Sequence, residues 1–227
     1  MKTHLLIPAA GMGRRLGKDL PKALVPLRGE ALLLATLKRF AFPWIAMPVI
    51  VLFPRGHEAE FRKVLASYPI PVELVEGGGE RQDSVMRGLR FIKGEANLVA
   101  IHDAARPFVS PEDISAVVEA AERHGAATLA MPVADTILMN DGGGFLHNTP
   151  DRSLLWACQT PQVFQIDVIR AAYGWAGENG TLCTDDATLV YRSGHAVKLV
   201  RGSASNFKIT TGSDLQYADF LMEHGFS

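Results

Sequence analysis

A segment rich in small residues follows the first apolar run of the chain and leads into basic residues. The small residues are Ala9, Ala10, Gly11 and Gly13, and the bases that follow include Arg15 and Lys22. Small side chains let backbone N–H groups approach phosphate oxygens closely, and the bases supply positive charge for a triphosphate. The segment lacks the Walker A pattern, and Leu16 stands where a dinucleotide-binding loop has its third glycine. We therefore expect a phosphate-binding turn of another type; the alternative is a plain strand-to-helix turn with solvated bases.

Asp103 stands at the end of a predicted buried strand, which is where open α/β sheets bind ligands. A carboxylate there can hold Mg²⁺ through one or two oxygens while substrate phosphates supply the other ligands. The alternatives are a turn aspartate or a plain ion pair with Arg106, three residues further on. We expect the preceding His102 to be a packed strand-end histidine and not a metal ligand.

Three consecutive glycines, Gly77, Gly78 and Gly79, stand before a predicted helix over residues 84–92. Ser84 is a residue type that suits the N-cap of such a helix. A purely structural turn needs one glycine, whereas three let the backbone approach the edge of a flat base. We therefore expect a nucleoside-binding loop at this position.

Four further polar residues, Thr136, Arg152, Thr160 and Lys208, stand apart from these motifs. Taken alone, each is typical of an ordinary surface residue, so residue type and spacing assign no role to them. One motif fails outright: His57-Glu58 has no second histidine at the spacing of a zincin helix, and we expect this pair on a helix surface.

The elements that must position these residues alternate regularly along the first half of the chain. Short apolar runs predict strands over residues 4–7, 49–53, 72–75, 98–101 and 128–131, with helices over 30–40, 57–66 and 84–92 between them. A further helix begins after Ser110, which is an N-cap residue followed by Pro111 and an acid. This alternation predicts an α/β fold with a Rossmann-like, doubly wound, mostly parallel sheet and right-handed crossovers.

The alternation stops between residues 132 and 159. Two strands, over residues 133–139 and 145–148, are predicted around an Asn-Asp-Gly turn. Because such a hairpin has little room inside a doubly wound core, we expect a projecting β-arm at about residues 133–158 within a single domain of residues 1–227. Helices over 166–176, 185–192 and 213–223 and a strand over 197–200 complete the prediction.

Composition sets the broad class of the protein. The chain has 227 residues, of which 48% are hydrophobic, and a formal net charge of -1. That charge balance argues against a nucleic-acid surface, and the most apolar stretch is short and interrupted by prolines, so we expect no membrane span. Two cysteines, Cys158 and Cys183, make no disulfide framework. Together with the lack of a signal peptide, they predict a cytoplasmic protein.

The motifs together resemble the family of 2-C-methyl-D-erythritol 4-phosphate cytidylyltransferases, and the resemblance runs nearly from end to end. It is carried by the small-residue segment with Pro21-Lys22, by residues 77–85 and by residues 102–107. Motifs at residues 132–136, 160–164, 184–187 and 206–210 follow in the same order. The resemblance implies a nucleotidyltransferase fold and transfer of CMP from CTP to methylerythritol phosphate, with Mg²⁺ as the cofactor.

The resemblance also implies a role for each motif residue. CTP would be bound by Ala9, Ala10, Gly11, Gly13, Gly78, Gly79, Ser84, Asp103 and Ala104. The catalytic cations would be Arg15, Lys22 and Lys208, and Asp103 would be the metal ligand. The acceptor would be held by Asp103, Arg106, Thr136, Arg152, Thr160 and Lys208. In this family the arm crosses a homodimer, so Thr136 and Arg152 would serve the partner's site.

Three other functions compete with this one. The closest is a ribitol-5-phosphate cytidylyltransferase, which resembles the same family; the pair Ala104-Ala105 favours the methylerythritol enzyme. A sugar-nucleotide synthetase that uses another nucleotide is the second. The third is a non-catalytic nucleotide-binding module, against which the joint presence of Arg15, Lys22 and Asp103 argues, since binding alone does not need all three.

Overall fold

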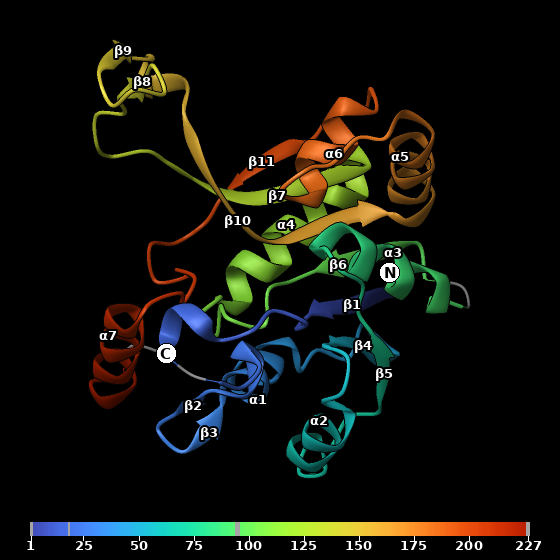
Figure 1. Ribbon diagram of the computed structural model, residues 1–227. Coiled ribbons are helices and arrows are strands. Elements are labelled where there is room, and N and C mark those ends of the chain that lie inside the picture. The colour runs from blue at the N-terminus through green and yellow to red at the C-terminus, as the bar shows by residue number, and fades with distance from the viewer. Residues whose placement is uncertain (1, 18, 94–95, 226–227) are drawn as a thin grey trace.

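A seven-stranded sheet forms the centre of the computed structural model, which describes residues 2–17, 19–93 and 96–225 (Figure 1). Its strands are β1 (Thr3–Pro8), β4 (Ile45–Phe53), β5 (Val72–Glu76), β6 (Leu98–Ile101), β7 (Ala126–Pro132), β10 (Trp156–Gln165) and β11 (Lys198–Arg201). They lie in the order β11-β7-β10-β6-β1-β4-β5. Every pairing is parallel except the two that β10 makes with β6 and β7. The predicted α/β fold with a mostly parallel sheet is confirmed.

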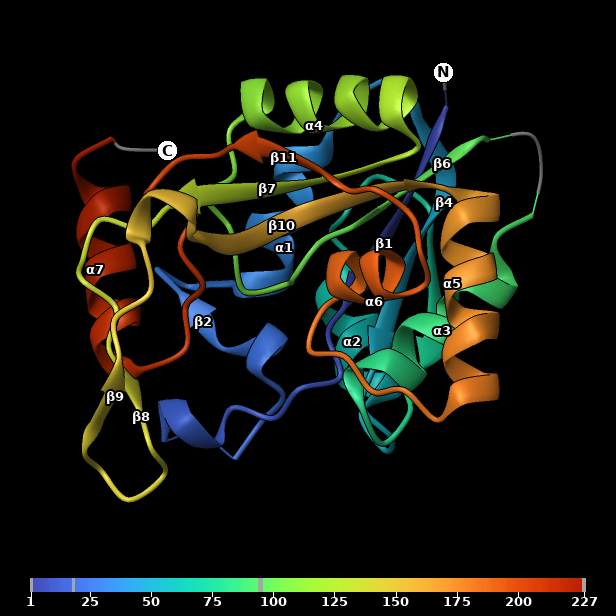
Figure 2. The same ribbon diagram turned by 90° about the horizontal axis from the view of Figure 1, so that it is seen from above.

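Helices cover both faces of this sheet, as the view from above shows (Figure 2). On one face lie α1 (Leu32–Leu37), α2 (Glu58–Leu65) and α4 (Pro111–His124), and on the other lie α3 (Arg81–Phe91), α5 (Ile166–Asn179) and α6 (Asp186–Arg192). Alternate side chains of β1 feed the two cores: Leu5 and Ile7 pack on the first face, and Leu6 packs on the second. This two-sided burial is why the strands are continuous apolar runs.

A third, smaller core holds the C-terminal helix α7 (Gly212–Glu223) against the short strand β2 (Pro26–Leu27), which pairs with β3 (Glu30–Ala31). Leu27, Leu32, Ala218 and Leu221 are among its buried members. It places α7 beside the first loop, whose Leu16 belongs to the same core. The predicted domain spans residues 1–227, and residues 1, 18, 94–95 and 226–227 lie outside the described part.

The order in which successive strands join the sheet reverses beside β1. The chain runs outward from β1 to β4 and β5, and β6 then enters on the opposite side of β1. Loops leaving the carboxyl ends of β1 and β6 therefore diverge, and the space between them is where doubly wound sheets bind ligands. Ala9 follows β1 directly, and Asp103 stands two residues beyond β6, so both predicted loops open onto this point.

The segment after β7 leaves the body of the molecule (Figure 1). Strands β8 (Met139–Asn140) and β9 (Leu146–Asn148) pair in a two-stranded sheet apart from the central one. Gly142 and Gly144 take φ values of 89° and 94° in the connecting turn, a region that favours glycine. The prediction of a strand over 133–139 was wrong, since only Met139 of that range is in a strand. The predicted end of the arm at 158 overlaps β10, whose first residues pair with β7.

Strand β10 is the main element that the sequence pattern did not predict. It contains Pro161 and the polar residues Gln159, Thr160 and Gln162, so it shows neither an apolar run nor strict alternation. The register with β7 shifts between Cys158 and Gln162, around the proline that cannot donate to the ladder. Strand pairing on both sides stabilises the segment despite its composition.

Several predicted boundaries also move. Helix α3 begins three residues before Ser84, and Glu80 is its N-cap, with its backbone N–H donating to the Asp83 carboxylate. Strand β4 begins at Ile45, four residues early, because its pairing with β1 tolerates an irregularity around Pro48. The predicted helix over 30–40 divides into β3, α1 and a 3₁₀ turn (Lys38–Phe40). Ser110 is confirmed as the N-cap of α4, since its side chain accepts from the Asp113 N–H.

No helix among the described residues combines the length and the apolar character that crossing a bilayer requires.

Candidate active site

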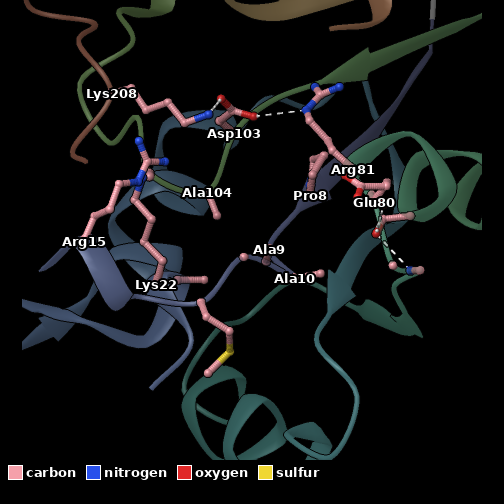
Figure 3. Close-up of a pocket in the computed structure, with 17 residues that line it drawn as sticks. Pro8, Ala9, Ala10, Arg15, Lys22, Glu80, Arg81, Asp103, Ala104 and Lys208 are labelled. Carbon is pink, nitrogen blue, oxygen red and sulfur yellow. Dashed lines mark hydrogen bonds and ion pairs between the residues drawn. The ribbon is translucent and has the colours of Figure 1, made fainter. Parts of the chain in front are cut away.

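A cavity of about 250 Å³ opens beyond the carboxyl ends of β1 and β6, where the strand order reverses (Figure 3). Its lining residues are Pro8, Ala9, Ala10, Gly11, Met12, Arg15, Lys22, Ala23, Gly78, Gly79, Glu80, Arg81, Ser84, Asp103, Ala104, Ala105 and Lys208. Four of these side chains are cationic and two are anionic, so the cavity is a positive site in a chain that is nearly neutral overall. Such a surface suits a polyanionic ligand.

Backbone hydrogen bonds hold the first loop in place. The Ala9 N–H donates to the Leu52 carbonyl at 2.9 Å, and the Lys22 N–H donates to the Gly11 carbonyl at 2.9 Å. These contacts bring Lys22 back beside the small residues, so one wall carries both the loop and its bases. Gly13 is buried behind this wall and does not line the cavity; its N–H donates to the Leu20 carbonyl instead.

Lys22 lies in an unusual electrostatic environment. Burial, together with the nearby positive charges of Lys208 and Arg15, lowers the pKa of Lys22 to about 8, although Asp103 acts in the opposite direction. Figure 3 shows Arg15, Lys22 and Lys208 gathered at one end of the cavity. Three bases without an equal number of acids form a site whose charge an anionic ligand would balance.

The glycine loop on the opposite wall is shaped by Ser84. Its hydroxyl accepts from the Gly78 N–H at 2.9 Å and donates to the Glu80 carbonyl at 3.0 Å. The buried Ser84 side chain therefore stabilises the loop through these two hydrogen bonds. The prediction that Ser84 is a helix N-cap was wrong, since Glu80 occupies that position. A β-carbon on Gly78 would overlap Asp83, so the close approach of the loop to α3 requires glycine there.

Asp103 lies between the two walls and is nearly buried. Its Oδ2 is 2.7 Å from Lys208 Nζ and 3.9 Å from Arg106 Nε, and its Oδ1 is 3.7 Å from Arg81 Nε. Burial by itself would raise the pKa of Asp103, but the charges of Lys208, Arg81 and Arg106 outweigh it and hold the pKa well below its usual value. Asp103 is thus an ionised carboxylate aimed at the cavity.

A hydrogen-bonded chain fixes the backbone of Asp103. Its N–H donates to Thr160 Oγ1 at 3.1 Å, and that hydroxyl is 3.1 Å from His102 Nδ1. His102 Nε2 lies 3.0 Å from the Arg106 carbonyl, which can only accept, so Nε2 carries the proton and Nδ1 accepts from Thr160. Burial lowers the pKa of His102 to about 4, which keeps the ring neutral. The expectation of a packed strand-end histidine is confirmed.

The residues expected to hold an acceptor are not all gathered at the cavity. Lys208 lines it, whereas Thr160 acts through Asp103 and Arg106 is buried behind, where its guanidinium donates to the carbonyls of Asn206 at 2.6 Å and Cys158 at 3.4 Å. Thr136 and Arg152 are exposed on the arm, and Arg152 donates to the Ala134 carbonyl at 2.9 Å. Their roles toward an acceptor stay predictions.

Arg81 is a site residue to which the sequence assigned no role. It lines the cavity with Glu80 and forms ion pairs with Asp103 and with Asp186, whose Oδ2 is 2.7 Å from Arg81 Nη1. Its position within the motif after the glycines was visible, but its two partners come from distant parts of the chain. The pairing therefore could not be read from local spacing.

The donor set bears on whether a metal fits. Across the described ranges, no three His, Cys, Asp or Glu side chains come together as a metal cage. Asp103 nevertheless presents an ionised carboxylate to a cavity lined by bases. Mg²⁺ commonly binds through one or two carboxylates with substrate phosphates and water as its other ligands, and Asp103 fits that pattern.

Comparisons with known proteins agree on one family. The family model for 2-C-methyl-D-erythritol 4-phosphate cytidylyltransferase matches residues 3–224. The protein of that name from Symbiobacterium thermophilum is 42% identical over 219 residues, which cover 96% of this chain and 92% of that protein. The one from Bacillus velezensis is 42% identical over 226 residues, 98% and 97% of the two chains. The crystal structure of the protein from Thermus thermophilus superposes with a TM-score of 0.82 at 38% identity, over 98% and 100%.

Proposed function

This chain belongs to the 2-C-methyl-D-erythritol 4-phosphate cytidylyltransferase family, and we propose that the cavity between β1 and β6 is where it carries out the family's reaction. The enzyme transfers CMP from CTP to 2-C-methyl-D-erythritol 4-phosphate and releases pyrophosphate. The observation that supports this location is the joint presence of Arg15, Lys22, Asp103 and Lys208 on one cavity.

The reaction needs no dedicated base. A phosphate monoester is largely dianionic at neutral pH, because its second pKa is about 6. Its oxygen attacks the α-phosphorus of CTP, a new P–O bond forms, and the bond to the β-phosphate breaks with release of pyrophosphate. What the protein must supply is positioning of two polyanions and neutralisation of the charge that develops.

We assign these tasks to named residues. Arg15 and Lys22 would stabilise the developing charge on the α-phosphate, close to the backbone of Ala9 to Gly11. The loop at Gly78 and Gly79, braced by Ser84, would meet the cytosine and ribose. Lys208 would receive the acceptor phosphate, since its ammonium already faces the centre of the cavity.

Mg²⁺ is the cofactor we propose, with Asp103 as its protein ligand. When bound, the metal would add positive charge at the phosphates. The pKa of Asp103 lies well below the usual value for a carboxyl group, so Asp103 is ready to coordinate at neutral pH. Chelation by EDTA should stop pyrophosphate release and leave the melting temperature unchanged; unchanged activity would refute the metal requirement.

We further propose a homodimer formed through the arm. Leu138, Phe145 and Leu146 are 62%, 75% and 64% exposed, which is unusual for large apolar residues clustered on one hairpin. A partner subunit would cover them and would bring Thr136 and Arg152 of one protomer to the other's acceptor site.

We also place the enzyme in the cytoplasm, since Cys158 and Cys183 are free thiols.

The decisive experiment measures pyrophosphate release with Mg²⁺ and CTP in parallel with two acceptors, methylerythritol 4-phosphate and ribitol 5-phosphate. Release with the first acceptor alone is the expected result. Release with the second alone would move the acceptor assignment to the ribitol enzyme, and release with neither would refute the activity at this cavity.

A further inference from the structure

The guanidinium of Arg81 is shared between two carboxylates and not offered to a ligand alone. Its Nη1 lies 2.7 Å from Asp186 Oδ2, and its Nε lies 3.7 Å from Asp103 Oδ1 (Figure 3 shows the second pair). The two acids raise the pKa of Arg81 against the opposing effect of burial. Because two carboxylates already balance its charge, Arg81 is better suited to orienting Asp103 than to binding a triphosphate. Arg15 and Lys22 remain for the triphosphate.

The partners that hold Asp186 in place belong to α5 and β10, and neither partner lines the cavity. It is 1% exposed, and Tyr173 of α5 donates its hydroxyl to Asp186 Oδ1 at 2.6 Å. The backbone N–H groups of Asp186 and Ala187 both donate to Gln162 Oε1 at 3.0 Å, so the start of α6 is tied to β10. Burial raises the pKa of Tyr173, and the phenol therefore remains a donor.

A second contact docks the same turn of α3 onto the same region. The Gln82 side chain donates through Nε2 to the Thr181 carbonyl at 3.0 Å and accepts through Oε1 from the Cys183 N–H at 3.0 Å. Adjacent residues of α3 thus contact the segment from α5 to α6 in two places. The position of Arg81 is consequently set by a hydrogen-bonded unit outside the cavity.

We propose that Asp186 and Tyr173 are positioning residues of the transfer reaction: they hold Arg81 against Asp103 and so fix the carboxylate that faces both substrates. The proposal rests on the function assigned to this cavity. An oriented carboxylate matters because partners behind a metal ligand set its direction and basicity, and their removal typically lowers metal affinity or activity by roughly 10- to 100-fold.

The test uses the full chain with Asp186→Asn, which keeps the shape and the backbone contacts to Gln162 but removes the charge that holds Arg81. We expect kcat to fall roughly tenfold and the Mg²⁺ concentration for half-maximal velocity to rise several-fold. By calorimetry, the affinity for CTP with Mg²⁺ should fall, whereas the affinity for CTP in EDTA should not. An unchanged Mg²⁺ dependence would overturn the proposal.

Asp185→Asn is the matched control, because the Asp185 carboxylate caps α6 by accepting from the Thr188 N–H at 2.9 Å and accepts from Gln162 Nε2 at 3.2 Å. Asp185→Asn should lower the melting temperature without changing the Mg²⁺ dependence of the velocity. A change in Mg²⁺ dependence equal to that of Asp186→Asn would mean that the effect is a general structural one and would overturn the proposal. If Asp186→Asn does not fold, Tyr173→Phe is the deciding variant. We expect it to raise the Mg²⁺ concentration for half-maximal velocity by a smaller factor, and an unchanged Mg²⁺ concentration would refute the proposal. Wild-type enzyme without pyrophosphate release would refute the proposed function instead.

Discussion

Lys208 Nζ lies 2.7 Å from Asp103 Oδ2, so the last motif of the chain reaches the centre of a site built mainly from its first half. The contact joins the segment before α7 to the carboxyl end of β6. It holds a cation and an ionised acid together at the place where the proposed reaction would bring two polyanions together.

Removal of a cavity cation should impair turnover. Lys208→Met and Arg15→Ala should each lower kcat by roughly 10²-fold, the size of effect seen when one donor to a developing negative charge is lost. Lys63→Met, on the exposed surface of α2, is the matched control and should leave kcat unchanged. Near-normal turnover in Lys208→Met or Arg15→Ala would remove that residue from the catalytic set.

The pH profile should report Lys22. Because its pKa is lowered to about 8, the free enzyme carries this charge below pH 8 and loses it above. We expect kcat/KM for CTP to decline above about pH 8, and kcat to decline only at higher pH because bound triphosphate raises the pKa again. Lys22→Arg, which stays charged, should lose the decline in kcat/KM. A wild-type profile that is flat to about pH 10, near the ordinary pKa of lysine, would contradict the assignment.

The glycine loop should affect CTP binding. Gly78→Ala forces the loop away from Asp83, so KM for CTP should rise roughly tenfold or more. Gly177→Ala, on the exposed surface of α5, is the control, since an added β-carbon there would meet no atom within 4 Å. Steady-state kinetics with varied CTP distinguishes the two variants, and a KM for CTP in Gly78→Ala that equals the KM in Gly177→Ala and in the wild type would show that the loop does not contact the nucleotide.

Thr160 should matter to stability as well as to catalysis. Thr160→Val removes the acceptor for the Asp103 N–H and the donor to His102, which leaves buried polar groups unpaired. We expect a loss of about 1–3 kcal/mol in the free energy of unfolding by urea denaturation, with a lower kcat. Thr160→Ser retains the hydroxyl and should recover most of both, and an equal loss in the serine variant would point to packing.

The exposed apolar residues of the arm lead us to expect an oligomer that depends on protein concentration. Light scattering at assay concentration should give the mass of a dimer, and Phe145→Asp with Leu146→Asp should shift it to that of a monomer. In the dimer, Arg152→Ala should raise KM for the acceptor more than KM for CTP. Arg123→Ala, exposed on α4, serves as the control. A monomeric mass for the wild type would overturn a site shared between subunits.

Local sequence determined the parts of this protein that depend on short-range physics. Continuous apolar runs predicted strands buried on both faces, and the small residues followed by bases predicted a phosphate-binding turn after the first strand, which stays a prediction. Asp103 was placed correctly from its distance beyond an apolar strand, and Ser110 from the capping preference of the helix that follows it. The confirmed fold class follows from the same alternation of strands and helices.

Tertiary structure decided the remainder, because it depends on which distant segments meet. Strand β10 has too many polar residues and a proline to be recognised alone, yet two neighbouring strands stabilise it in the middle of the sheet. That strand brings Thr160 to Asp103, and α6 brings Asp186 to Arg81. Spacing along a chain carries no information about such pairings, since their free energy comes from burial and charge across the folded molecule.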